Sequence, residues 1–211
     1  MPNIIGRCLY GGIMNKKILL FCNGLSGTGK TTFIEKYAIA SGFHNLISAT
    51  TRPPRDGEFD GVSYYFRDES YFDREKFATY LFVNENSWKP GDKKWLYGIP
   101  ESEVENHIGE NLVYDVIQPR YTRDLMNWFI AHKLNAEYDF RVAYFTAHNQ
   151  DNFDIVKTRT SMKNDMAVRR ANTCNLGDFH RAGVEIDFIT RPRDEMPNIN
   201  LIRLVERVAG R

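Results

Sequence analysis

Short apolar runs alternate with segments whose apolar residues recur at intervals of three and four. The runs are bounded by turn residues and are short enough for buried strands, whereas the spaced segments are typical of amphipathic helices. Strands are predicted over residues 18–22, 46–49, 61–66, 95–99, 111–117, 140–145 and 184–189. Helices are predicted over residues 30–40, 70–81, 100–107, 119–132 and 198–208, and the polar segment 151–175 is expected to be largely helical. This alternation predicts an α/β fold, in which a parallel sheet is flanked by helices.

The segment 119–132 has the clearest helical pattern. Tyr121, Leu125, Trp128 and Phe129 would share one face of this helix. We expect that face to be buried against the sheet.

A glycine-rich loop joins the first predicted strand to the first predicted helix. It matches the pattern G-x-x-x-x-G-K-[ST], in which glycines let the backbone aim N–H groups at a phosphate. The start of the helix adds the positive end of its dipole. Lys30 can reach the β- and γ-phosphates, and the Thr31 hydroxyl can be a ligand of Mg²⁺. The loop predicts ATP binding by Gly24, Ser26, Gly27, Thr28, Gly29, Lys30, Thr31 and Thr32. The alternative, a glycine-rich turn with an incidental lysine, is disfavoured by the flanking strand and helix.

Composition narrows the class of protein. The chain has 211 residues, 42% of them hydrophobic, which suits one globular domain. Its 28 basic and 27 acidic residues leave a net charge of +1, with no long charge block, so a nucleic-acid partner is not expected. No apolar run approaches the ~20 residues of a membrane helix, so no membrane partner is expected.

The three cysteines, Cys8, Cys22 and Cys174, fit neither a zinc pattern nor a disulfide framework. We therefore expect a reducing, cytoplasmic compartment, with Cys22 as a core residue. Residues 1–13 precede Met14, which would itself serve as a natural start. They are interpreted either as a loose native arm or as the result of a start assigned too far upstream.

A second motif follows the phosphate-binding loop. It reads Ser48-Ala-Thr-Thr-Arg52-Pro-Pro-Arg55-Asp-Gly-Glu-Phe-Asp-Gly-Val-Ser-Tyr64-Tyr-Phe. This segment resembles the acceptor-binding segment of guanylate kinases, and the likeness covers about residues 16–209. The resemblance implies a P-loop nucleoside monophosphate kinase that moves the γ-phosphoryl group of ATP, with Mg²⁺, to GMP or dGMP.

The resemblance also implies a domain organisation. An arm at 1–13 would precede a guanylate kinase-like domain at 14–211. Its core would comprise 14–47, 100–150 and 178–211, with an inserted NMP-binding subdomain at about 48–99 and a helical lid at about 151–177. The expected partners are small-molecule nucleotides, and no oligomeric state is indicated.

Further site residues are implied by the same resemblance. The acceptor phosphate would be held by arginine forks and tyrosine hydroxyls, a set that suits a phosphate dianion. Two lid arginines would spread the charge of the transferring phosphoryl group, as arginine fingers do. The implied acceptor-binding residues are Ser48, Arg52, Arg55, Tyr64, Tyr97, Glu85 and Asp115. The implied catalytic residues are Lys30, Arg159 and Arg170, and Arg191 would lie near the ATP adenine. Without the upstream loop, a pair of surface arginines would be an equal interpretation of Arg52 and Arg55.

The sequence departs from the family where guanine is read. Ile99 follows Tyr97-Gly98, where the family has a serine or threonine. The family strand reads Asp-x-Asp, and the corresponding positions here hold Tyr114 and Val116, with Asp115 between them. A same-fold kinase with a different phosphorylated acceptor is therefore one alternative. The other is a non-catalytic guanylate kinase-like binding module, against which the complete phosphate-binding loop argues.

Overall fold

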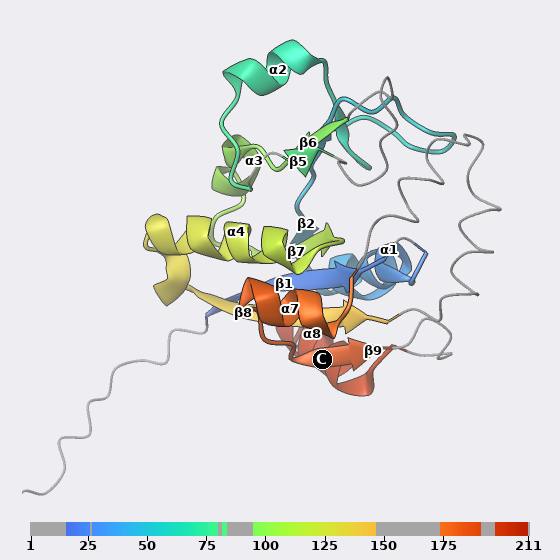
Figure 1. Ribbon diagram of the computed structural model, residues 1–211. Helices are drawn as coiled ribbons and strands as arrows, with labels where there is room; N and C mark the ends of the chain where they lie inside the picture. Colours follow the sequence, from blue (N-terminus) through green and yellow to red (C-terminus); the bar gives the residue numbers. More distant parts are fainter. Residues whose placement is uncertain are drawn as a thin grey trace, which may run out of the picture.

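A five-stranded parallel sheet forms the centre of the protein in the computed structural model (Figure 1). The structure describes residues 16–25, 27–79, 82–83, 95–146, 174–190 and 197–210. The strand order is β2-β7-β1-β8-β9, and every neighbouring pair is parallel, so the predicted parallel sheet is confirmed. The strands are β1 (Lys17–Gly24), β2 (Phe43–Asn45), β7 (Asn111–Val116), β8 (Tyr138–Phe145) and β9 (Phe188–Thr190).

Helices cover both faces of this sheet because β1 is apolar on both sides. Leu19 and Phe21 pack in one cluster with residues of α4 (Pro119–Ala131) and α7 (Leu176–Ala182). Leu20 and Cys22 pack on the opposite face with residues of α1 (Lys30–Phe33) and α8 (Ile199–Val208). The Cys22 side chain is fully buried, as expected of a core residue.

Two of the predicted helices are confirmed in detail. The helical run that starts at Lys30 passes from α1 through a π turn, η1 (Ile34–Ala38), and a 3₁₀ turn, η2 (Ile39–Ser41). In α4, all four residues of the expected buried face are at most 8% exposed. A 3₁₀ turn, η4 (Leu134–Ala136), then leads into β8.

A second, smaller sheet lies above α4 in the view of Figure 1. Its order is β4-β3-β6-β5, with β3–β4 parallel and the other pairs antiparallel. Two short helices, α2 and α3, accompany it. The elements are β3 (Ala49–Thr50), β4 (Tyr65–Phe66), α2 (Glu69–Arg74), β5 (Phe82–Val83), β6 (Leu96–Gly98) and α3 (Glu101–Glu105).

Tertiary contacts change several predicted boundaries in this region. The strand predicted at 46–49 is wrong: the chain leaves the large sheet after β2 and enters the small sheet at β3. Leu46 is the last residue held to the large sheet, by its N–H bond to the Val113 carbonyl at 2.9 Å. The strand predicted at 61–66 is only β4, because Gly61 to Ser63 form a turn.

The helix predicted at 70–81 ends at Arg74. Beyond it, Phe77 forms a bridge with Pro100 and stacks on Phe72, with ring centroids 5.1 Å apart. The Ala78 N–H also bonds to the Ile99 carbonyl at 2.8 Å. Pairing with a distant segment therefore overrides the local helical period.

Near the C-terminus, β9 begins at Phe188 rather than at residue 184, because Val184 packs into the core instead of pairing in the sheet. The helix α7 was not predicted, although Asn175 and Asp178 form a capping box at its start. The arm at 1–13 and the lid residues 151–173 lie outside the described residues. No helix among the described residues is long and apolar enough to span a membrane.

Candidate active site

The glycine-rich loop begins where β1, the central strand, ends at Gly24. A Cβ atom on Gly24 would lie 2.4 Å from the Phe145 carbonyl oxygen of the neighbouring strand, and the residue has φ of 149°. Gly29, which caps the first helix, has φ of 91° in the left-handed region. Both positions therefore require glycine, which places the loop directly over the carboxyl edge of the sheet.

Lys30 lies folded across this loop. Its Nζ donates to the carbonyl oxygens of Gly24 and Leu25, at 2.8 Å each, and lies 3.5 Å from the Asp115 carboxylate. The side chain is only 5% exposed. The Thr28 hydroxyl donates to the same Leu25 carbonyl at 2.8 Å. A cation is thus held at the mouth of the loop by weak acceptors, which a phosphate oxygen can replace.

The acidic residue of β7 faces the phosphate-binding loop. β7 pairs with β1 in unbroken register from Leu112 to Val116, with Asp115 beside Cys22. The strand therefore has no bulge, and Tyr114 and Val116 lie in the core cluster on the other face. Burial, first, and then the charge of Asp115 raise the pKa of the Cys22 thiol, so this cysteine stays protonated.

The acceptor motif forms a second charged cluster around Arg52. This guanidinium is 3% exposed, and its Nη2 donates to both carboxylate oxygens of Glu58, at 2.9 and 2.8 Å. It also lies over the rings of Tyr64 and Phe66, at 5.2 and 5.8 Å from their centroids. The Arg55 backbone N–H donates to Glu58 at 2.8 Å. One carboxylate therefore joins both arginines of the motif.

Two tyrosines complete this cluster. The rings of Tyr64 and Tyr97 meet edge-on, with centroids 6.1 Å apart. Burial raises the pKa of each hydroxyl, so both are neutral hydrogen-bond donors near pH 7. For Arg52, burial by itself would lower the pKa, but Tyr97 and Glu58 outweigh it and the pKa is raised. The arrangement can bind a dianion with two cations and neutral donors.

The two clusters lie within electrostatic range of one another. Burial and the neighbouring Tyr97 raise the pKa of Tyr64, and the charge of Asp115 raises it further. Tyr114 is buried nearby and forms a hydrogen bond with Ser48. The carboxylate that contacts Lys30 is thus electrostatically coupled to the tyrosine that contacts Arg52.

Sequence reasoning missed Glu58 and gave Tyr114 no part in the site. The signal that could have identified Glu58 was its place in the motif. An acid six residues after Arg52, across a proline-rich turn, can pair with that arginine. Tyr114 could be placed only after the register of β7 was known. Ile99, in turn, is fully buried in the core, with its N–H bonded to the Thr79 hydroxyl at 2.9 Å.

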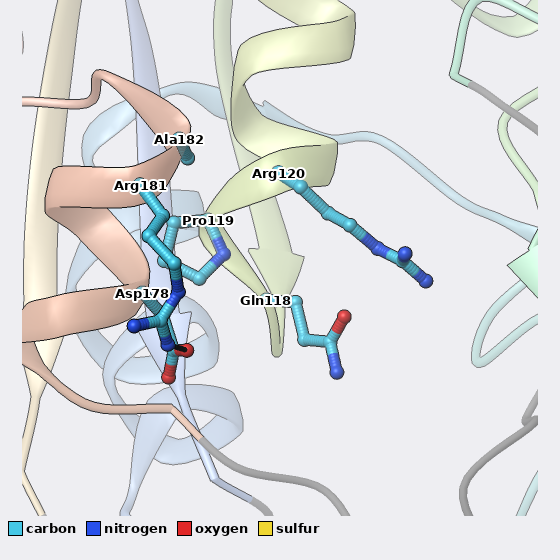
Figure 2. Close-up of a pocket in the computed structure, with 6 residues that line it drawn as sticks. All are labelled: Gln118, Pro119, Arg120, Asp178, Arg181 and Ala182. Carbon is cyan, nitrogen blue, oxygen red and sulfur yellow. Dashed lines mark hydrogen bonds and ion pairs between the residues drawn. The ribbon is translucent and has the colours of Figure 1, made fainter.

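A pocket of about 200 Å³ lies beside the end of β7, between the start of α4 and one side of α7 (Figure 2). Arg181 is paired with Asp178 on one side. Gln118 and Arg120 extend from the start of α4 to the opposite side of the view. The pocket is lined by Gln118, Pro119, Arg120, Asp178, Arg181 and Ala182.

The remaining predicted site residues, Ser26, Glu85, Arg159, Arg170 and Arg191, lie outside the described residues. Thr31 and Thr32 are exposed in the first turn of α1. The structure therefore brings together Lys30 with Asp115, and Arg52 with Tyr64 and Tyr97.

A parallel sheet whose central strand ends in this lysine-bearing loop defines a P-loop protein of the α/β class. No protein-family model matches the chain. It is 26% identical to a guanylate kinase of Rhodopseudomonas palustris (strain BisB5) over 170 residues, covering 74% of this chain and 72% of that enzyme. It is 36% identical to a guanylate kinase of Clostridium tetani over 107 residues, 49% of this chain and 48% of that enzyme. The chain is therefore similar in sequence to guanylate kinases.

Shorter matches recur in other organisms. A guanylate kinase of Thermus thermophilus is 35% identical over 105 residues, so the match spans less than half of that enzyme. Among solved structures, the crystal structure of guanylate kinase from Anaplasma phagocytophilum matches at 15% identity and a TM-score of 0.46. That match covers 92% of this chain and 84% of that one.

Proposed function

We propose that the protein transfers the γ-phosphoryl group of ATP to GMP or dGMP. The observation that carries this proposal is the pairing of two anion sites. Lys30 and Asp115 lie at the first, the phosphate-binding loop, and Arg52 lies beside Tyr64 at the centre of the second. The similarity to guanylate kinases supports a guanine nucleotide as the acceptor over another phosphorylated compound.

The residues contribute to the proposed reaction by binding the two substrates and by neutralising the charge of their phosphates. The loop holds the donor phosphates, and Lys30 exchanges its two backbone carbonyls for their oxygens. Arg52 and Arg55 exchange the Glu58 carboxylate for the acceptor phosphate. The phosphate oxygens can accept the same paired hydrogen bonds from the planar guanidinium groups. The attacking atom is already a phosphate oxyanion, so the transfer needs positioning rather than a general base.

Mg²⁺ fits the donors at this place. Thr31 offers a hydroxyl in the first turn of α1, and Asp115 a 39% exposed carboxylate, and hard oxygen donors that leave room for water suit this ion. When bound, Mg²⁺ neutralises charge on the donor phosphates. Arg159 and Arg170 are proposed to close over the phosphoryl group, Ser26 and Arg191 to contact ATP, and Glu85 to contact the base. A cytoplasmic location is proposed with these roles.

The proposal is tested with a panel of GMP, dGMP, AMP, UMP, CMP and TMP, each supplied with ATP and Mg²⁺. ADP formation is measured with and without acceptor, and the nucleoside diphosphate product is identified directly. We expect GMP and dGMP to be phosphorylated with a kcat/KM at least roughly tenfold above the other acceptors. Preferred phosphorylation of another nucleotide would contradict the choice of acceptor, and no transfer to any of the six would contradict the kinase.

A further inference from the structure

Two histidines and a glutamate meet at the edge of the large sheet, at a place that the proposed kinase reaction does not use. His44 lies in the edge strand β2, and His107 and Glu110 lie in the turns that follow α3. One ligand atom from each of the three residues lies within 4.8 Å of those of the other two. We propose that these three side chains form a binding site for a divalent transition-metal ion of the Zn²⁺ type.

The ligand types favour such an ion over Mg²⁺ or Ca²⁺. Imidazole nitrogen suits Zn²⁺, Ni²⁺ and Cu²⁺, whereas Mg²⁺ and Ca²⁺ prefer oxygen ligands alone. Two histidines and one carboxylate, with water in the fourth position, make a known tetrahedral zinc set. The side chains are accessible to an ion in solution, because His44, His107 and Glu110 are 26%, 27% and 51% exposed.

One distance within the cluster already matches the spacing that the ion requires, and all three ligand atoms lie within 4.8 Å of one another. In a tetrahedral site with bonds of ~2.0–2.1 Å, neighbouring ligand atoms lie about 3.3 Å apart. Nδ1 of His107 lies 3.2 Å from the Glu110 carboxylate, so this pair already has the required spacing. The rings of His44 and His107 stack with centroids 3.4 Å apart and an angle of 13° between them. Because the lone pairs lie in the ring planes, one of these partly exposed rings must turn about its χ2 bond before both nitrogens can bind one ion.

A buried carboxylate orients the first histidine. Nε2 of His44 lies 3.1 Å from Glu103, whose side chain is only 5% exposed. Glu103 is itself fixed by the Ile47 N–H at 3.0 Å and the Tyr65 hydroxyl at 2.8 Å. A histidine that donates one ring N–H to a carboxylate presents its other nitrogen to a metal, which is the usual arrangement behind zinc ligands. His44 would therefore bind the ion through Nδ1.

Bound metal would join the edge strand β2 to the turn between α3 and β7. His44 belongs to β2, whereas His107 and Glu110 lie just before β7. An ion shared by His44 and the turn after α3 closes a long loop of chain. We therefore expect metal binding to raise the melting temperature, since it favours the folded state by mass action.

The test uses the full chain without an affinity tag, freed of metal by a chelator. Zn²⁺ is titrated in competition with a chromogenic chelator, and Co²⁺ is added separately to report tetrahedral coordination by its visible absorption. We expect one equivalent of Zn²⁺ per chain and a rise in melting temperature. His44→Gln and His107→Gln should each weaken binding at least roughly tenfold, and Glu103→Gln by about 10–100-fold.

Two controls separate this site from other sources of binding. His180→Gln removes an exposed histidine of α7 that lies outside the cluster, and it should bind Zn²⁺ as the unaltered chain does. Asp115→Asn removes the proposed Mg²⁺ ligand and should also leave Zn²⁺ binding unchanged, so the result does not depend on the proposed kinase activity. Wild-type affinity in both His44→Gln and His107→Gln, or no stoichiometric binding by the unaltered chain, would overturn the proposal.

Discussion

Lys30 and Arg52, the central cations of the two proposed phosphate sites, are held by different kinds of contact. Lys30 contacts two backbone carbonyls and the partly exposed Asp115 carboxylate. Arg52, by contrast, donates two hydrogen bonds to one carboxylate and lies over two aromatic rings. Apart from the contact with Asp115, the polar contacts of the Lys30 side chain lie within its own loop. Arg52 is placed both to serve the proposed acceptor site and to stabilise the turn that holds Glu58.

We expect Lys30→Ala to retain a cooperative melt and to lose phosphoryl transfer by about 10²–10⁴-fold, the scale of removing one preorganised charge. The matched control is Lys36→Ala, which removes an exposed lysine later in the same helical run. Steady-state kinetics and thermal melts of both variants check the expectation. Near-normal turnover by Lys30→Ala would exclude the proposed role of the loop.

Arg52→Lys tests the fork at the acceptor site. A lysine keeps the charge but loses the planar pair of donors, so we expect the KM for the acceptor to rise by about 10–100-fold while the KM for ATP stays nearly unchanged. Arg67→Lys is the control: Arg67 also pairs with an acid, Asp60 at 2.8 Å, and lies over Tyr65. An equal loss of affinity for ATP would show that Arg52 serves the donor instead.

At the scale of elements, the end of β1 determines where the glycine-rich loop of the proposed ATP site begins. β8 runs beside β1 in register as far as Phe145, opposite Gly24, so the carbonyl at this point leaves no space for a side chain. The close approach of the two strands, and not only the turn, requires glycine here.

Gly24→Ala should therefore lower the free energy of unfolding by about 3 kcal/mol or more, since backbone strain and overpacking add. Gly109→Ala is a matched comparison, because Gly109 also has a positive φ, of 92°, but has open space around its Cβ position. That variant should lose only about 1–2 kcal/mol. Urea denaturation measures both, and equal losses would mean that β8 yields to the added methyl group.

At the scale of the whole molecule, many tyrosine hydroxyls are withdrawn from water. Burial raises the pKa of Tyr64, Tyr97 and Tyr114, and burial together with the Glu103 hydrogen bond raises the pKa of Tyr65 to about 12. These hydroxyls stay protonated in the folded chain at a pH at which they ionise in the unfolded chain.

Stability should consequently be insensitive to these groups below about pH 10 and fall between about pH 10 and about pH 12. In that window the unfolded chain binds fewer protons than the folded chain, so the free energy of unfolding decreases as pH rises. Urea midpoints measured at intervals above about pH 8 check this sign. Tyr65→Phe should lose less stability across the window than the unaltered chain, and an identical loss would show that Tyr65 does not take part.

The sequence by itself determined the parts of this protein that depend on local pattern. The alternation of apolar runs predicted the parallel sheet and the buried face of α4, because period and turn residues are local properties. The loop around Lys30 and the motif around Arg52 could be recognised for the same reason, because each proposed phosphate site is built largely from consecutive residues.

The tertiary structure alone decided what depends on residues far apart in the chain. The unbroken register of β7 turned Asp115 toward Lys30 and buried Tyr114, since neighbouring strand residues point to opposite faces. Pairing with the segment at Pro100 ended α2 early. His44 and His107 met only through the packing of β2 against the turns after α3. Such contacts follow from register and packing, which no local pattern encodes.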